Sequence, residues 1–144
     1  MALKVPKSID FFNNNLLLGL RNGSIMEIKN VIEEKSETKI HMQSHFEGET
    51  WGLAVFENKF ITSGGDNQIL MFDADTHEVI RSGKISEKVS KKKEEDATTA
   101  KGDKFQPNKQ ARAVAVSLKH QHLVVCSNFG KTSIRSLENF DKKI

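Results

Sequence analysis

The sequence predicts an all-β fold built from about three four-stranded antiparallel sheets, and three repeated segments lead to this prediction. Each segment has an alternating apolar strand, a tight polar turn and a second alternating strand. The segments are Leu16–Ile28, Phe60–Asp73 and, in a more degraded form, Leu123–Ile134. Alternation of apolar and polar residues is typical of half-buried strands, and recurrence at a fixed period is typical of repeat architectures.

The spacing of these segments matches the length of one blade of a β-propeller. Asn22 and Asp66 lie about 44 residues apart, whereas Asp66 and Phe129 lie about 63 apart, which indicates an insertion of about 19 residues. A chain of 144 residues therefore holds about three blades, fewer than the roughly four to eight of a closed propeller. We expect an incomplete propeller whose uncovered edges associate with the remaining blades or with copies of the chain.

The first blade is expected over residues 8–44. Turns at residues 13–15 and 22–23 divide it, because asparagine and glycine accept the positive φ angles of tight hairpins. The expected strands are near Ile9–Phe12, Leu16–Leu20, Ser24–Ile28 and Thr38–Gln43.

The second and third blades are expected over residues 51–85 and 112–144. In the second, Gly64–Asn67 is the turn between two apolar strands. The expected strands there are near Trp51–Phe56, Lys59–Ser63, Gln68–Asp73 and Glu78–Ile85. In the third they are near Arg112–Leu118, His122–Ser127 and Lys131–Leu137, and residues 138–144 are long enough only to start a fourth. Helix is almost absent from this prediction.

A charged insertion, residues 86–110, separates the second and third blades. It contains seven lysines, five acidic residues and almost no apolar side chains. Because it buries too little surface to offset its chain entropy, we predict a flexible loop. Lys91, Lys92 and Lys93 are candidates for contact with an acidic surface, although the acidic run that follows them favours a solvated insertion.

Composition excludes several classes of protein. One cysteine, Cys126, precludes an internal disulfide and favours a reducing compartment. No apolar run reaches the roughly 18 residues of a membrane span, and the first residues lack a signal-peptide core, so a cytoplasmic protein that does not contact membranes is expected. Basic and acidic residues number 22 and 19 and are interleaved, and there is no tyrosine. This pattern argues against nucleic-acid binding.

Motifs for catalysis, metals or cofactors are also weak. Gly130–Thr132 ends like a phosphate-binding loop but lacks the glycine that the motif needs five residues earlier. His120 and His122 alternate on one expected strand face, with no third metal ligand placed by spacing. Asp73 and Asp75 fit the turn between two strands better than a carboxylate pair. We therefore predict a protein that is not an enzyme and holds no cofactor.

Two segments of the second blade carry a resemblance to a known family. His45 stands where WD40 repeats have a Gly-His pair, and Phe72–Asp73 stands about 27 residues later, where the Trp-Asp dipeptide occurs in such repeats. This resembles a WD40 blade. More narrowly, Gly48–Ala54 resembles the Glu-Leu-Trp-Gly-Leu-Ala signature of the echinoderm microtubule-associated protein-like family, whose members carry tandem propellers.

The resemblance implies a structural tetrad in this blade. Its members would be His45, Thr62 (or Ser63), Asp66 and Phe72, joined in the full form by buried hydrogen bonds from His to Asp and from Ser or Thr to Trp. Phe72 cannot donate the indole hydrogen bond, so we expect a shortened network. The first and third blades have no recognisable tetrad.

Trp51 at the start of an expected strand has two interpretations. It either packs between neighbouring sheets, as its large apolar area favours, or forms an exposed platform for a ligand. The leading hypothesis is a scaffold that binds tubulin, microtubules or other cytoskeletal proteins, and the family resemblance suggests the cytoskeleton and the cilium axoneme as its location. The alternative is a general WD40 adaptor for a protein other than tubulin.

Overall fold

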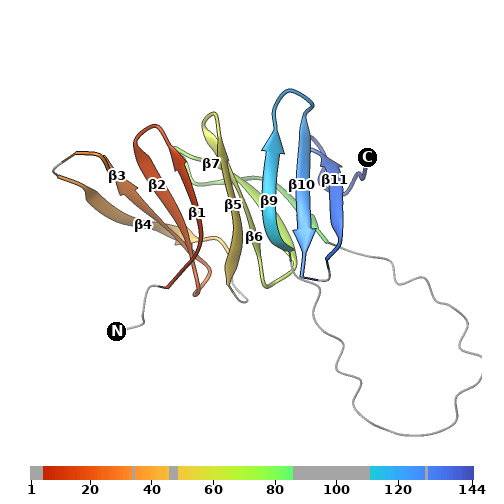
Figure 1. The fold of residues 1–144 in the computed structure, drawn as a ribbon, viewed down its shortest axis with the longest axis horizontal. Coiled ribbons are helices and arrows are strands. Elements are labelled where there is room, and N and C mark those ends of the chain that lie inside the picture. Colours follow the sequence, from red (N-terminus) through yellow and green to blue (C-terminus); the bar gives the residue numbers. More distant parts are fainter. Residues whose placement is uncertain (1–4, 34, 46–48, 86–110, 129) are drawn as a thin grey trace, which may run out of the picture.

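The all-β prediction is confirmed. The computed structural model describes residues 5–33, 35–45, 49–85, 111–128 and 130–144, and this part of the chain forms eleven strands in three antiparallel sheets, without helix (Figure 1). Blade 1 contains β1 (Pro6–Phe12), β2 (Asn15–Leu20), β3 (Ser24–Lys29) and β4 (Glu37–Gln43). Blade 2 contains β5 (Thr50–Phe56), β6 (Lys59–Gly64), β7 (Gln68–Asp73) and β8 (Val79–Lys84). Blade 3 contains β9 (Ala111–Ser117), β10 (His122–Ser127) and β11 (Thr132–Ser136).

Within each blade, strands that follow one another in sequence pair side by side. The end of the chain lies antiparallel to β11, with a bridge between Arg135 and Lys143. Backbone hydrogen bonds from Ser136 to Lys142 and from Ile144 to Ile134 flank this bridge, so the segment forms the start of a fourth strand that the sequence allowed. The same segment also contacts the outer strand of blade 2, where Arg81 donates a hydrogen bond to the carbonyl of Leu137 over 2.6 Å. The expected insertion, residues 86–110 with its three lysines at 91–93, lies outside the described residues.

Tight turns form where asparagine and glycine were expected to form them. Asn13 and Asn14 connect β1 to β2 with φ angles of 46° and 63°, the left-handed values that a two-residue hairpin requires at both central positions. Gly23 has a φ of 81° between β2 and β3. Asn67 has a φ of 67° between β6 and β7.

Among the described residues, two apolar cores lie between blades, and a third cluster lies within blade 1. One core joins blades 1 and 2 and the other joins blades 2 and 3. The first contains Ile25, Leu53, Phe60, Leu70 and Phe72. The second contains Phe56, Ile61, Ile69, Met71, Ile85, Ala111, Leu123, Val125, Leu137 and Phe140. Because adjacent residues of one strand enter different cores, blade 2 is covered on both faces, which is the stacking expected of consecutive repeats.

The first strands of the three blades lie beside one another, β1 next to β5 and β5 next to β9. The sheets follow one another in chain order in Figure 1. In a complete propeller, blades are arranged around a central channel, and these three strands occupy the edge nearest to it. Ile9 and Phe11 lie on the face of blade 1 that points away from blade 2, and they are 62% and 51% exposed.

Candidate functional site

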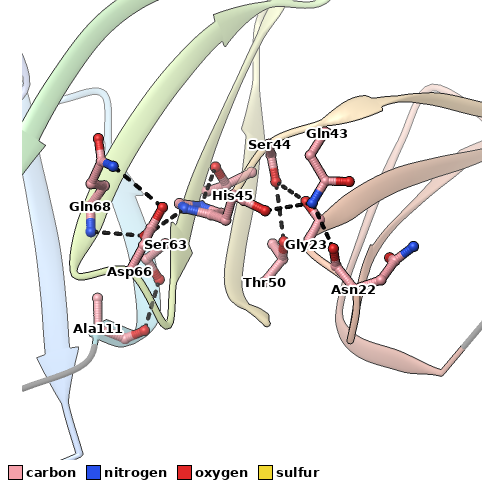
Figure 2. A network of polar contacts seen from close by, with 11 residues as sticks. Asn22, Gly23, Gln43, Ser44, His45, Thr50, Ser63, Asp66, Gln68 and Ala111 are labelled. Carbon is pink, nitrogen blue, oxygen red and sulfur yellow. Dashed lines mark hydrogen bonds and ion pairs between the residues drawn. The ribbon is translucent and has the colours of Figure 1, made fainter. Parts of the chain in front are cut away.

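The candidate site is a polar network centred on His45, in the link between β4 and β5 (Figure 2). The imidazole is fully buried. Its Nδ1 lies 2.8 Å from Oδ1 of Asp66, in the turn between β6 and β7, and its Nε2 lies 2.9 Å from Oγ1 of Thr62 on β6. A residue of the interblade link is thereby joined to two residues of the blade that follows it.

The acceptor chemistry of Asp66 fixes the orientation of this network. An ionised carboxylate only accepts hydrogen bonds, so Nδ1 of His45 donates to it. Nε2 and the hydroxyl of Thr62 extend this chain of contacts, and which of the two donates depends on whether Nε2 carries a proton. Burial alone would raise the pKa of Asp66, but the hydrogen bond and charge of His45 and the backbone amide of Gln68 together lower this pKa below its ordinary value of 3.8. Asp66 is therefore ionised at neutral pH.

Gly64 makes room for the imidazole. A Cβ atom at this position would lie 2.4 Å from Cγ of His45 and 2.5 Å from its Nδ1, closer than non-bonded atoms approach. The histidine ring packs directly on the backbone of Gly64, the last residue of β6, so this position has no room for a side chain. Alanine at residue 64 would displace the ring from Asp66.

Phe72 lies outside the hydrogen-bonded part of the network. Its ring is buried and stacks on Phe60 at a centroid distance of 5.0 Å, in the core between blades 1 and 2. Ser63 points to the other face of β6, where its hydroxyl donates to the carbonyl of Ala111 in blade 3 over 3.3 Å. Of the sequence candidates, the structure thus brings together His45, Thr62 and Asp66.

A second branch of the network, not anticipated from the sequence, runs from the same link into blade 1. The hydroxyl of Ser44 donates to the carbonyl of Gly23 over 2.8 Å and lies 3.1 Å from the hydroxyl of Thr50. The amide of Gln43 donates to the carbonyls of Asn22 and His45. The sequence signal for this branch is a run of polar residues, 43–45, at the end of an alternating strand. Figure 2 shows this branch beside the His45–Asp66 pair.

Trp51 occupies a different place, at the start of β5. The Lys7 Nζ lies 4.7 Å from the centre of the indole ring, and the guanidinium carbon of Arg112 lies 3.7 Å from it. Lys7 belongs to blade 1 and Arg112 to blade 3. The tryptophan is half-buried between neighbouring blades, as the packing interpretation expects, and its ring contacts two cations.

The remaining candidates within the described residues lie in turns or at strand ends. Asp73 accepts hydrogen bonds from the backbone amides of Asp75 and Thr76, both over 2.9 Å, as a turn residue. Contrary to the expectation that both histidines lie on one strand, His120 lies in the turn before β10, although its ring stacks 5.9 Å from that of His122. Among the described residues, no three His, Cys, Asp or Glu side chains are grouped to hold a metal. No helix in that same part of the chain has the length and apolarity to cross a membrane.

Successive antiparallel sheets stacked face to face define part of a β-propeller, and the buried His–Asp pair at the link into one of them is the contact that the resemblance to a WD40 blade implies. Comparisons with known proteins support this class. No family model matches the chain. The chain is 33% identical over 142 residues to the ciliary WD repeat-containing protein ctxp80 of Euplotoides octocarinatus. That alignment covers 96% of this chain and 19% of the relative, so the chain spans about a fifth of the curated protein that it matches.

Solved structures show the same fold at low sequence identity. A chain of the mitotic checkpoint complex superposes with a TM-score of 0.61 at 18% identity, over 92% of this chain and 36% of that one. The computationally designed protein Ika8 superposes with a TM-score of 0.59 at 13% identity, over 90% of this chain and 32% of that one. The three blades therefore form an incomplete propeller of WD40-like blades.

Proposed function

We propose that this chain is a non-catalytic propeller scaffold whose partner is a microtubule or an axonemal protein. The observation that carries the proposal is the 33% identity to a ciliary WD repeat-containing protein along nearly the whole chain. The start of β5, Trp51–Ala54, resembles the signature of the echinoderm microtubule-associated protein-like family, which supports the same context.

The charge of the chain is compatible with this partner. The formal net charge is +3, and tubulin is acidic, so long-range attraction would favour encounter between the two at low ionic strength. The buried His45 network has a structural role in this proposal: it holds the link between blades 1 and 2, and thereby fixes the surfaces that meet the partner.

Co-sedimentation with microtubules over a salt series tests the proposal. We expect the chain to pellet with microtubules at low ionic strength and to be released as salt screens the charges over about 10 Å at 0.1 M. Absence of pelleting at the lowest salt would contradict the proposal. Specific capture of a non-cytoskeletal protein, with no co-sedimentation, would assign the chain to the adaptor class instead.

A further inference from the structure

The first strands of all three blades have a β-bulge at the same position. Between β1 and β2, Pro6 pairs with Leu20 and Ser8 with Gly19, so Lys7 is the extra residue. The extra residue is Trp51 in β5 and Arg112 in β9. A bulge redirects the side chain of the extra residue, and such bulges are over-represented beside binding and catalytic sites. Three bulges in register therefore place one side chain per blade on a common line.

Neighbouring blades fix the backbone next to two of these bulges. The hydroxyl of Ser8 in blade 1 donates to the carbonyl of Thr50, directly before Trp51, over 3.2 Å. The hydroxyl of Ser63 in blade 2 donates to the carbonyl of Ala111, directly before Arg112. The side chains at the bulges are thus positioned by contacts across both blade interfaces. Lys7 and Arg112 consequently both contact the ring of Trp51.

The charges around this cluster are only partly compensated. Glu49 lies 3.5 Å from the ammonium group of Lys7 and 3.1 Å from Arg21, so one carboxylate serves two cations. Within the described part of the chain, Arg112 has no carboxylate at ion-pair distance. Its guanidinium group lies against the indole and keeps five N–H donors, which match a carboxylate in a bidentate geometry.

We propose that Lys7, Trp51 and Arg112 form a binding site for an acidic segment of a partner protein, a proposal that rests on the protein-binding function proposed above. Carboxylates of the segment would bind Arg112 and displace part of the Glu49 contact at Lys7. The indole orients both cations and excludes water from one side of each, which strengthens their attraction for an anion. Such a site selects acidic peptides by charge and by the spacing of the three bulges.

A nucleic acid fits this cluster less well than an acidic peptide. Binding of single-stranded nucleic acid uses open aromatic faces on which successive bases stack. Here Lys7 and Arg112 lie over the one tryptophan of the chain, and a base would have to displace a cation to stack. A carboxylate needs no such displacement.

Trp51 is the only tryptophan, and the chain has no tyrosine, so its fluorescence reports on this site directly. We would titrate the chain with a hexaglutamate peptide, using a hexaglutamine peptide as the neutral control. We expect a saturable change in Trp51 emission with hexaglutamate alone, weakened by salt. Arg112→Gln and Lys7→Gln should each raise the half-saturation concentration by about tenfold.

Lys119→Gln is the matched control, since it removes the same charge in the exposed turn at the far end of β9, and it should leave the titration unchanged. Equal curves for all variants, no binding by calorimetry, or tighter binding of oligothymidylate than of hexaglutamate would each overturn the proposal. Failure of peptide binding with retained microtubule pelleting would refute this site alone. Peptide binding without pelleting would refute only the cytoskeletal partner.

Discussion

The substitution Thr62→Val tests whether the His45 network stabilises the fold. Valine keeps the shape of threonine but removes the hydroxyl that lies 2.9 Å from Nε2 of His45. Both side chains are fully buried, so water cannot replace the lost partner. A buried polar atom left without its hydrogen bond costs about 1–3 kcal/mol. We therefore expect the free energy of unfolding to fall by about 2 kcal/mol.

Urea unfolding followed by Trp51 fluorescence measures this change. With a denaturant slope of about 2 kcal/mol/M, the midpoint should fall by about 1 M. Thr38→Val is the matched control, because Thr38 is exposed on β4 and its substitution should change stability by less than about 0.5 kcal/mol. Thr62→Ser keeps the hydroxyl and should recover most of the loss. Equal midpoints for Thr62→Val and Thr38→Val would refute the reasoning.

Two further predictions concern pH and self-association. Because the pKa of Asp66 is lowered below 3.8 in the fold, its ionised form stabilises the native state above that pH, and the contribution disappears as the pH falls through the lowered value. Asp66→Asn should therefore flatten the loss of stability below pH 3.8, measured by thermal unfolding, and an unchanged acid slope would contradict this role. Ile9→Lys combined with Phe11→Lys should reduce self-association measured by light scattering, since these exposed apolar side chains lie on the face of blade 1 that points away from blade 2; an unchanged mass distribution would show that this face is not involved.

Much of the secondary structure was predictable because it depends on local chemistry. Alternation in segments such as Phe60–Ser63 marks strands with two different faces, and Asn13 and Gly23 mark turns because few other residues accept their φ angles. The packing of the chain end onto blade 2 was not predicted. Residues 137–144 pack Phe140 into the core of blades 2 and 3, and no local pattern specifies that long-range contact.

The pairing of His45 with Asp66 was reached only through the resemblance to a family, since the two residues are far apart in sequence and no periodicity joins them. The hydrogen bonds by which serines of one blade reach the next blade were not predictable from the sequence pattern either. In blade 1 the hydroxyl that reaches the next blade comes from Ser8 on the first strand, whereas in blade 2 it comes from Ser63 on the second strand, opposite Gly52. The two hydroxyls make equivalent contacts with the next blade, although they belong to different strands of their own blades.

The sequence by itself determined that this protein is built from β-strands, that tight turns join them and that they repeat at blade length. These properties follow from side-chain alternation and from the few residues that accept left-handed backbone angles. Only the tertiary structure decided that Lys7, Trp51 and Arg112 meet. Their meeting depends on the register of three strand pairs and on the stacking of three sheets, and both are set by contacts between residues that lie far apart along the chain.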